Sequence, residues 1–118
     1  KYLYDRGIGM EPRMKLLTFV GTTLADLKDF PEDARREAGY QLDRVQNGLD
    51  PKDWKPMPSV GAGVREVRIR EESGAYRIFY VTCIGDYVYV LHAFTKKTQK
   101  TTLSDINIGK ARYKAVVS

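Results

Sequence analysis

The sequence predicts an α+β fold, in which an antiparallel β-sheet carries two helices on one face and is followed by a C-terminal helix. Three observations predict it. Apolar residues recur at helical spacing in the first half of the chain, three strand-like segments follow, and a further helical segment ends the sequence. Helices and strands that are segregated along a chain in this way are typical of α+β proteins. The expected element order is β-α-α-β-β-β-α.

The first half of the chain is predicted to form one strand and two helices. Residues 15–20 (KLLTFV) are predicted to be a short strand, and Thr23 to cap a helix over residues 24–29. Pro31 suits the first turn of the second helix, and Asn47-Gly48 suits its end. The apolar stripe of this second helix consists of Ala34, Ala38, Leu42, Val45 and Leu49.

The second half is predicted to form an antiparallel meander and a last helix. Residues 64–71 alternate between apolar and charged side chains, and residues 76–82 and 87–94 are joined by Ile84-Gly85-Asp86 as in a hairpin. The prolines within residues 50–63 exclude a helix or a central strand, so an ordered loop is expected there. Ser104 is expected to cap a helix over residues 105–117.

Length and composition favour a single small domain. We expect residues 14–118 to form it, with residues 1–13 as an N-terminal extension or an expression remnant. No apolar run approaches the roughly 20 residues of a membrane helix, so no membrane partner is expected. The lone cysteine, Cys83, forms no internal disulfide and is expected to be a small buried hydrophobe. Both features favour the cytoplasm.

The positive charge is concentrated at one end of the chain. The formal net charge is +5, and residues 94–118 carry six Lys or Arg against one acidic residue, so the whole surplus lies there. Residues 22–53 carry five basic and eight acidic residues. A basic segment beside an acidic one indicates two different surfaces. The basic one either binds a polyanion or is a solvated tail.

The candidate site consists of basic and aromatic residues. One His and one Cys disfavour a metal site, and no phosphate-binding glycine motif occurs. Arginines on neighbouring predicted strands and lysines after the third strand can converge on one patch, while rings can stack on unpaired bases. Such cations can also stabilise a five-coordinate phosphorus during attack by a ribose 2′-hydroxyl. The members are Arg68, Arg70, Arg77, Lys96, Lys97, Lys100, Tyr76, Tyr80, Tyr87, Tyr89 and Phe94.

The single histidine has two possible roles. His92 could act as an acid or base at neutral pH, or it could be a core residue. Simple alternation along residues 87–94 would place it on the same strand face as Val88, Val90 and Phe94. The residues alone leave both roles open.

Several motifs together resemble the RelE/ParE superfamily of bacterial type II toxins, and most closely its phage-derived Gp49-like, HigB-type branch. The resemblance covers residues 14–117. It is carried by KPMP, the pattern G-V-x-E-[VI]-R, the tripeptide AYR, and the basic run that follows VYVLHAF. The resemblance implies a RelE-like fold and a toxin that cuts mRNA, typically on the ribosome, with no metal or other cofactor. It also implies neutralisation by a helix-turn-helix, HigA-like antitoxin, with a possible heterotetramer.

The resemblance assigns roles to individual residues. Arg77 of AYR matches the arginine that binds the scissile phosphate, Arg70 matches a basic strand residue, and Lys97 matches a second cation at the phosphate. His92 would take a proton-transfer role. The RNA-binding set expected from the residues themselves is Arg68, Lys96, Lys100, Tyr76 and Phe94. The tyrosine that often follows the basic run is replaced by Thr101-Thr102-Leu103, which leaves the general acid and base open.

Two other functions fit the same fold. ParE relatives poison DNA gyrase without cutting RNA, and a non-catalytic RNA-binding module would also use a basic patch. The antitoxin could cover the acidic helices over residues 24–49 or the basic patch itself.

Overall fold

The computed structural model describes residues 14–82 and 84–118, so the expectations for residues 1–13 and for Cys83 lie outside the described residues. Within these ranges, no helix is long and apolar enough to span a membrane. The elements in chain order are β1 (Leu16–Phe19), α1 (Thr23–Lys28), α2 (Glu32–Gln46), β2 (Trp54–Pro56), β3 (Arg65–Glu71), β4 (Gly74–Val81), β5 (Tyr87–Lys96) and α3 (Leu103–Val117).

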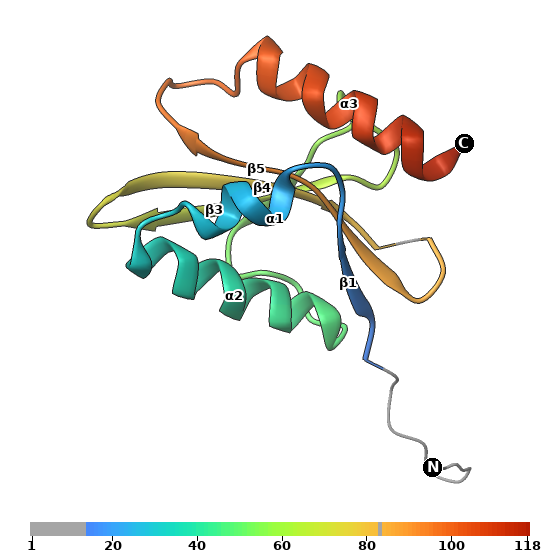
Figure 1. Ribbon diagram of the computed structural model, residues 1–118, viewed down its shortest axis with the longest axis horizontal. Coiled ribbons are helices and arrows are strands. Elements are labelled where there is room, and N and C mark those ends of the chain that lie inside the picture. The colour runs from blue at the N-terminus through green and yellow to red at the C-terminus, as the bar shows by residue number, and fades with distance from the viewer. Residues whose placement is uncertain (1–13, 83) are drawn as a thin grey trace, which may run out of the picture.

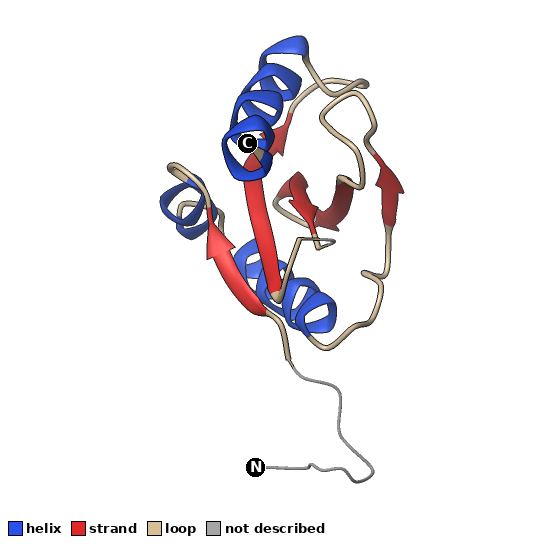
Figure 2. Ribbon diagram, turned by 90° about the vertical axis from the view of Figure 1, so that its right-hand side faces the viewer, coloured by secondary structure: helices blue, strands red, loops and turns tan. Residues whose placement is uncertain are grey.

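The described strands form one sheet in the order β1-β5-β4-β3-β2. In Figure 1, α1 and α2 lie on one side of this sheet and α3 on the other. Figure 2, turned by 90°, shows β1 and the short β2 at opposite edges. The predicted α+β class, the helix pair on one face and the C-terminal helix are confirmed.

Two features of the sheet differ from the prediction. The sheet is mixed rather than antiparallel, because β1 pairs with β5 in the parallel direction. The two strands are about 70 residues apart in sequence, with α1, α2 and three other strands between them, so no local pattern indicates that they pair. In addition, residues 54–56 form the edge strand β2, paired with β3. Pro56 is tolerated there because an edge strand needs fewer ladder hydrogen bonds.

The first core lies between the sheet and the α1–α2 side. The stripe of α2 packs as predicted, and the strands contribute residues such as Val67, Ile78 and Val90. Leu49 is the exception: α2 ends at Gln46, the chain turns at Gly48 (φ 82°), and Leu49 is left 53% exposed. The Gly48 position therefore ends the stripe one turn earlier than its apolar spacing suggests.

The start of α2 is tied to the β3–β4 turn by Asp33. Its carboxylate accepts hydrogen bonds from Ser73 Oγ (2.7 Å) and from its neighbour Ala34 N (2.6 Å). The Ser73 hydroxyl is the main reason that the pKa of Asp33 lies below its ordinary value.

We expect Ser73→Ala to raise the pKa of Asp33 toward its ordinary value, as measured by NMR titration. A lowered pKa stabilises the fold at pH values above the unfolded-state pKa, and this contribution is lost as the pH falls through the folded-state pKa. The pH-dependent part of the stability difference from wild type should therefore be present at neutral pH and vanish in acid. Ser104→Ala is the control, and a stability difference that grew in acid would contradict this account.

The second core lies on the opposite face, under α3. It contains Phe79, Val81 and Leu91 from the sheet and Met57, Val60 and Val64 from the loop before β3, with Ile106, Tyr113 and Val116 of α3 packed against them. Gly109 is the buried residue of α3, and it allows the helix to approach Phe79 closely. The helix covers the β4–β5 side of this face, while Arg68 and Arg70 on β3 stay exposed, as expected.

The cap of α3 lies two residues earlier than predicted. Thr102, not Ser104, is the N-cap: its hydroxyl accepts a hydrogen bond from Asp105 N at 3.2 Å, and it donates to Asp105 Oδ2 at 2.8 Å. Thr102 and Asp105 satisfy each other in the manner of a capping box. The sequence T-T-L-S offers several hydroxyls, and the reciprocal bond to Asp105 selects Thr102.

A β-bulge in β5 corrects the predicted face of His92. The β4–β5 register pairs Phe79 with His92 but Tyr80 with Val90, so Leu91 is the extra residue. Because one extra residue reverses the alternation, Val88 and Val90 face the first core while His92 and Phe94 lie toward α3. The bulge therefore separates the histidine from the two valines.

A cationic pocket as the candidate functional site

The strand register places several charged side chains on the α3 face of the sheet. Arg68 on β3 is opposite Arg77 on β4, and Arg77 is opposite Phe94 on β5. Two residues further along each strand, Arg70 on β3 is opposite Ala75 on β4, and Ala75 is opposite Lys96 on β5. Like charges directly opposite each other in a sheet are unfavourable, so the Arg68–Arg77 pair is not explained by stability of the empty protein.

Arg68, Arg77 and Lys96 are among the residues that line an open pocket with a volume of about 390 Å³. Its lining comes from β2, the segment between β2 and β3, the strands β3, β4 and β5, the segment after β5 and the N-terminal part of α3. Five of the lining side chains are cationic and one is a carboxylate. The lining residues are Lys55, Met57, Ser59, Glu66, Arg68, Arg77, Lys96, Gln99, Lys100, Thr101 and Ile106.

Arg77 lies at the floor of this pocket. Its side chain is 9% exposed, one Nη donates to Tyr76 O at 3.0 Å, and Nε lies 3.8 Å from Glu66 Oε1. In the described part of the chain, no acceptor is hydrogen-bonded to Nε. Burial lowers the pKa of Arg77 below its usual value, the nearby Arg68 and Arg70 lower it further, and Glu66 opposes them. A nearly buried guanidinium whose nearest carboxylate oxygen lies 3.8 Å away has an incompletely balanced charge, which attracts an incoming anion.

Lys96 lies beside Arg77 at the end of β5. Desolvation is the main reason that the pKa of Lys96 is lowered, the charge of Arg77 lowers it further, and Glu66 acts in the opposite direction. The ammonium group therefore loses a proton more readily than that of an ordinary surface lysine.

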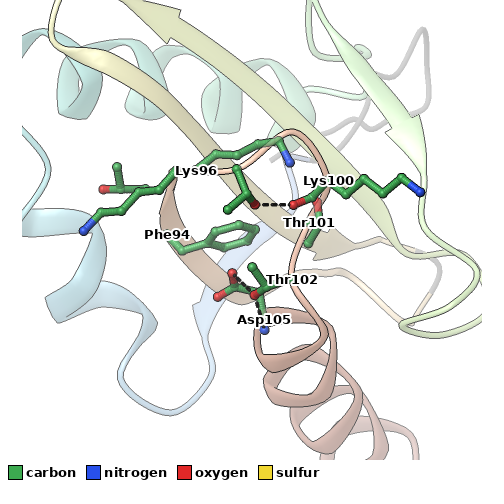
Figure 3. A pocket seen from close by; sticks show the side chains of 9 residues that line it. Phe94, Lys96, Lys100, Thr101, Thr102 and Asp105 are labelled. Carbon is green, nitrogen blue, oxygen red and sulfur yellow. Dashed lines mark hydrogen bonds between the residues drawn. The ribbon is translucent and has the colours of Figure 1, made fainter.

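A smaller pocket of about 140 Å³ adjoins the first and shares Lys96, Lys100 and Thr101 with it. Figure 3 shows this pocket: Phe94 lies between Lys96 and the start of α3, where Thr102 and Asp105 are hydrogen-bonded to each other. Lys97 lines this small pocket. The two pockets therefore lie next to each other near the end of β5, with Lys96, Lys100 and Thr101 lining both.

The structure brings together most, but not all, of the residues expected from the sequence. Arg77, Arg68, Lys96 and Lys100 line the larger pocket, and Lys97 and Phe94 line the smaller one. Arg70 is exposed on the same face, and its charge contributes to the lowered pKa of Arg77. It is not among the residues that line either pocket.

Tyr76 does not belong to the site. It is 2% exposed and lies in the first core, on the opposite face from Arg77, with its ring 4.8 Å from that of Phe30. Its hydroxyl donates to Ser73 Oγ at 2.8 Å. Adjacent residues of a strand point to opposite faces, so Tyr76 and Arg77 cannot contact the same ligand. The prediction that Tyr76 binds RNA was therefore wrong.

His92 lies beneath α3 rather than in either pocket. It is 6% exposed, stacks on Phe94 (ring centroids 4.7 Å apart), and its Nε2 is 2.8 Å from Asp105 Oδ1. The geometry favours the core role: the ring links β5 to the first turn of α3.

We expect His92→Leu to reduce stability without removing the chemistry of the pocket. The substitution removes the hydrogen bond to Asp105, which should lower the free energy of unfolding by about 1–3 kcal/mol. Denaturant unfolding measures this loss, and any activity of the pocket per folded molecule should stay close to wild type. A folded His92→Leu protein without activity would instead return His92 to a catalytic role.

Sequence reasoning missed three members of the site. Glu66 could have been included, since alternation along residues 64–71 places it on the same face as Arg68. Lys55 lines the pocket because β2 pairs with β3, which places Lys55 opposite Glu66. The prolines near Lys55 argued against a strand there, so this pairing was not expected. Thr101 enters through its hydroxyl, which donates to Glu66 Oε2 at 2.8 Å. The sequence carries no signal for that long-range bond.

Comparison with known proteins places the chain in a family. The family model described as Phage derived protein Gp49-like (DUF891) matches residues 25–114. No curated protein gives a significant match. The matched region begins within α1 and extends into α3, so it contains both cores and every residue that lines the two pockets. Because the match covers well over half of the 118 residues, the chain belongs to the phage-derived Gp49-like family, a family of RelE/HigB-type toxins.

Proposed function

We propose that this toxin is an endoribonuclease that cuts mRNA on the ribosome, with the cationic pocket as its active site. The observation that supports this most strongly is Arg77, which is almost buried, has a donor without a hydrogen-bond partner in the described chain, and is surrounded by further cations. Such a cluster is unfavourable when empty and becomes favourable when a phosphate enters.

The reaction would be attack by a ribose 2′-oxygen on the adjacent phosphorus, with the 2′-hydroxyl proton passing to solvent water. The bond between phosphorus and the 5′-oxygen breaks, which gives a 2′,3′-cyclic phosphate and a 5′-hydroxyl end. Arg77 would bind the non-bridging oxygens with paired N–H donors, and Arg68, Lys100 and Lys97 would bind neighbouring phosphates. Phe94 offers a ring edge for a base near the smaller pocket.

Lys96 is the proton donor that we propose for the leaving 5′-oxygen. It lines both pockets, and its lowered pKa makes its ammonium a better acid than an ordinary lysine. His92 is not needed for this step. Arg70, exposed on the same face, would add to the attraction of the RNA backbone.

We further propose that residues 14–118 act as a single cytoplasmic domain, which a helix-turn-helix, HigA-like antitoxin neutralises, with a heterotetramer as a possible assembly. The helices α1 and α2 lie on the opposite side of the sheet from α3 (Figure 1), and strand register places Arg68, Arg77 and Lys96 of the pocket on the α3 face. One small interface would therefore cover only one of the two candidate surfaces. Hydrogen exchange on the complex distinguishes them. Protection at residues 94–102 would indicate direct occlusion of the pocket, and protection at residues 24–49 would indicate binding to the helices.

A cleavage assay with purified protein tests the proposed reaction. Wild-type protein, added to ribosomes that translate a defined mRNA, should release fragments with 5′-hydroxyl and cyclic phosphate ends. Cleavage should weaken steeply with salt because phosphate contacts displace counterions. Intact mRNA under these conditions, with the protein folded, would contradict the proposal.

A further inference from the structure

Glu66 is an unusual residue in a pocket that would bind phosphate. It is 1% exposed, and it is the one carboxylate among the described residues that line the larger pocket. On the sheet it is opposite Lys55 of β2 and Phe79 of β4. A buried carboxylate is unfavourable unless it is paired and hydrogen-bonded, so its contacts should explain why it is there.

The two oxygens of Glu66 face different groups. Oε2 accepts the hydrogen bond from Thr101, which lies on the segment between β5 and α3 that also carries Lys97 and Lys100. Oε1 lies 3.8 Å from Arg77 Nε and 4.0 Å from Lys55 Nζ. These are ion-pair distances that are too long for hydrogen bonds. The carboxylate therefore attracts both cations without using their N–H donors.

We infer that Glu66 is a positioning residue: it is the internal counter-ion of the pocket and, through Thr101, it holds the lysine-bearing segment 97–102 in place. The inference rests on the proposed function only where it names an RNA phosphate as the anion that binds these cations. When the phosphate enters, it adds a second negative charge that these cations can balance. Glu66 itself is too deeply buried to contact the substrate, and it acts through Arg77, Lys55 and Thr101.

Glu66→Gln tests the charge while keeping the size of the side chain and an oxygen that can accept from Thr101. Without the negative charge the cations repel one another more strongly, so Lys96 Nζ should titrate at lower pH in an NMR experiment. Inorganic phosphate should bind several-fold more tightly, because the pocket gains net positive charge. For RNA cleavage, kcat should fall while KM stays equal or decreases, because Arg77 is less well positioned.

Thr101→Val tests the second contact separately. It removes the hydrogen bond and keeps the charge of Glu66, so amide exchange in residues 97–102 should accelerate while Lys96 titrates as in wild type. Glu71→Gln is the matched control, since Glu71 lies on the same strand but on the other face. It should change neither quantity.

The inference is overturned if Lys96 titrates identically in Glu66→Gln and wild type, or if phosphate binds more weakly to the variant. Should Glu66→Gln fail to fold, unchanged exchange of residues 97–102 in Thr101→Val overturns the inference instead. The titration, phosphate binding and exchange need no RNA. A wild-type protein that cuts no RNA would therefore contradict the proposed function and leave these results standing.

Discussion

Arg77→Met should abolish growth arrest when the protein is produced in a bacterium without its antitoxin. The substitution removes the guanidinium from the pocket floor and leaves an unbranched side chain of similar length. Loss of one preorganised donor group that stabilises transition-state charge reduces turnover by about 10²–10³-fold. Arg77→Lys should keep part of the activity, because it retains the charge but loses the paired donors of the guanidinium.

The fold should survive this substitution, which separates loss of chemistry from loss of structure. Arg77 is buried against other cations, so its replacement by an apolar side chain removes a desolvation penalty along with an ion pair. Because Glu66 keeps Lys55 and Thr101 as partners, we expect the loss in free energy of unfolding to stay below the roughly 3–5 kcal/mol that removing one partner of a buried ion pair costs. Arg36→Met is the matched control, because the Arg36 side chain lies on the solvent-exposed side of α2, and this variant should stay toxic. A folded Arg77→Met protein that still arrests growth would place the active site elsewhere.

Gly109→Ala should destabilise the protein, although alanine is the better helix former. A Cβ at position 109 would lie 2.8 Å from Phe79 Cδ2 and 3.0 Å from Val60 Cγ1. Phe79 is fully buried and cannot move aside, so α3 would have to shift away from the sheet. Overpacking of this kind costs about 1–3 kcal/mol. The shift would also carry Ile106 and the start of α3 away from the pocket.

Gly39→Ala on α2 is the matched control, because a Cβ there meets no atom within 4 Å. It should raise stability by about 1 kcal/mol, the ordinary helix preference of alanine over glycine. Urea unfolding of the two variants should therefore give shifts of opposite sign. Equal stabilisation by both substitutions would show that α3 does not approach Phe79 as closely as described.

The order and faces of most elements could be predicted because their signals are local. The stripe of α2 and the alternation in β3 each repeat within one segment, and Gly85 marks the hairpin turn. The parallel β1–β5 pair and the edge strand β2 could not, since their partners are set by packing between distant segments. The bulge at Leu91 is also invisible in the sequence, and it alone decides which face receives His92.

The candidate site shows the same division. Arg68, Arg77 and the lysines after β5 could be placed together from strand geometry, and the AYR motif singled out Arg77. Tyr76 supplies a ring on the same strand as Arg77, but strand alternation places that ring in the first core, on the opposite face. Lys55 and Thr101 could not be found, since each reaches Glu66 through a long-range contact.

The most direct test of the central claim is to map mRNA 5′ ends after induced expression, in wild type and in Arg77→Met. The account predicts new 5′ ends inside translated reading frames with wild type and none with the variant. Growth arrest with intact mRNA and DNA damage signalling would contradict it and indicate a gyrase-poisoning toxin. Normal growth and intact mRNA with abundant folded protein would contradict it too, and would indicate a module that binds without cutting.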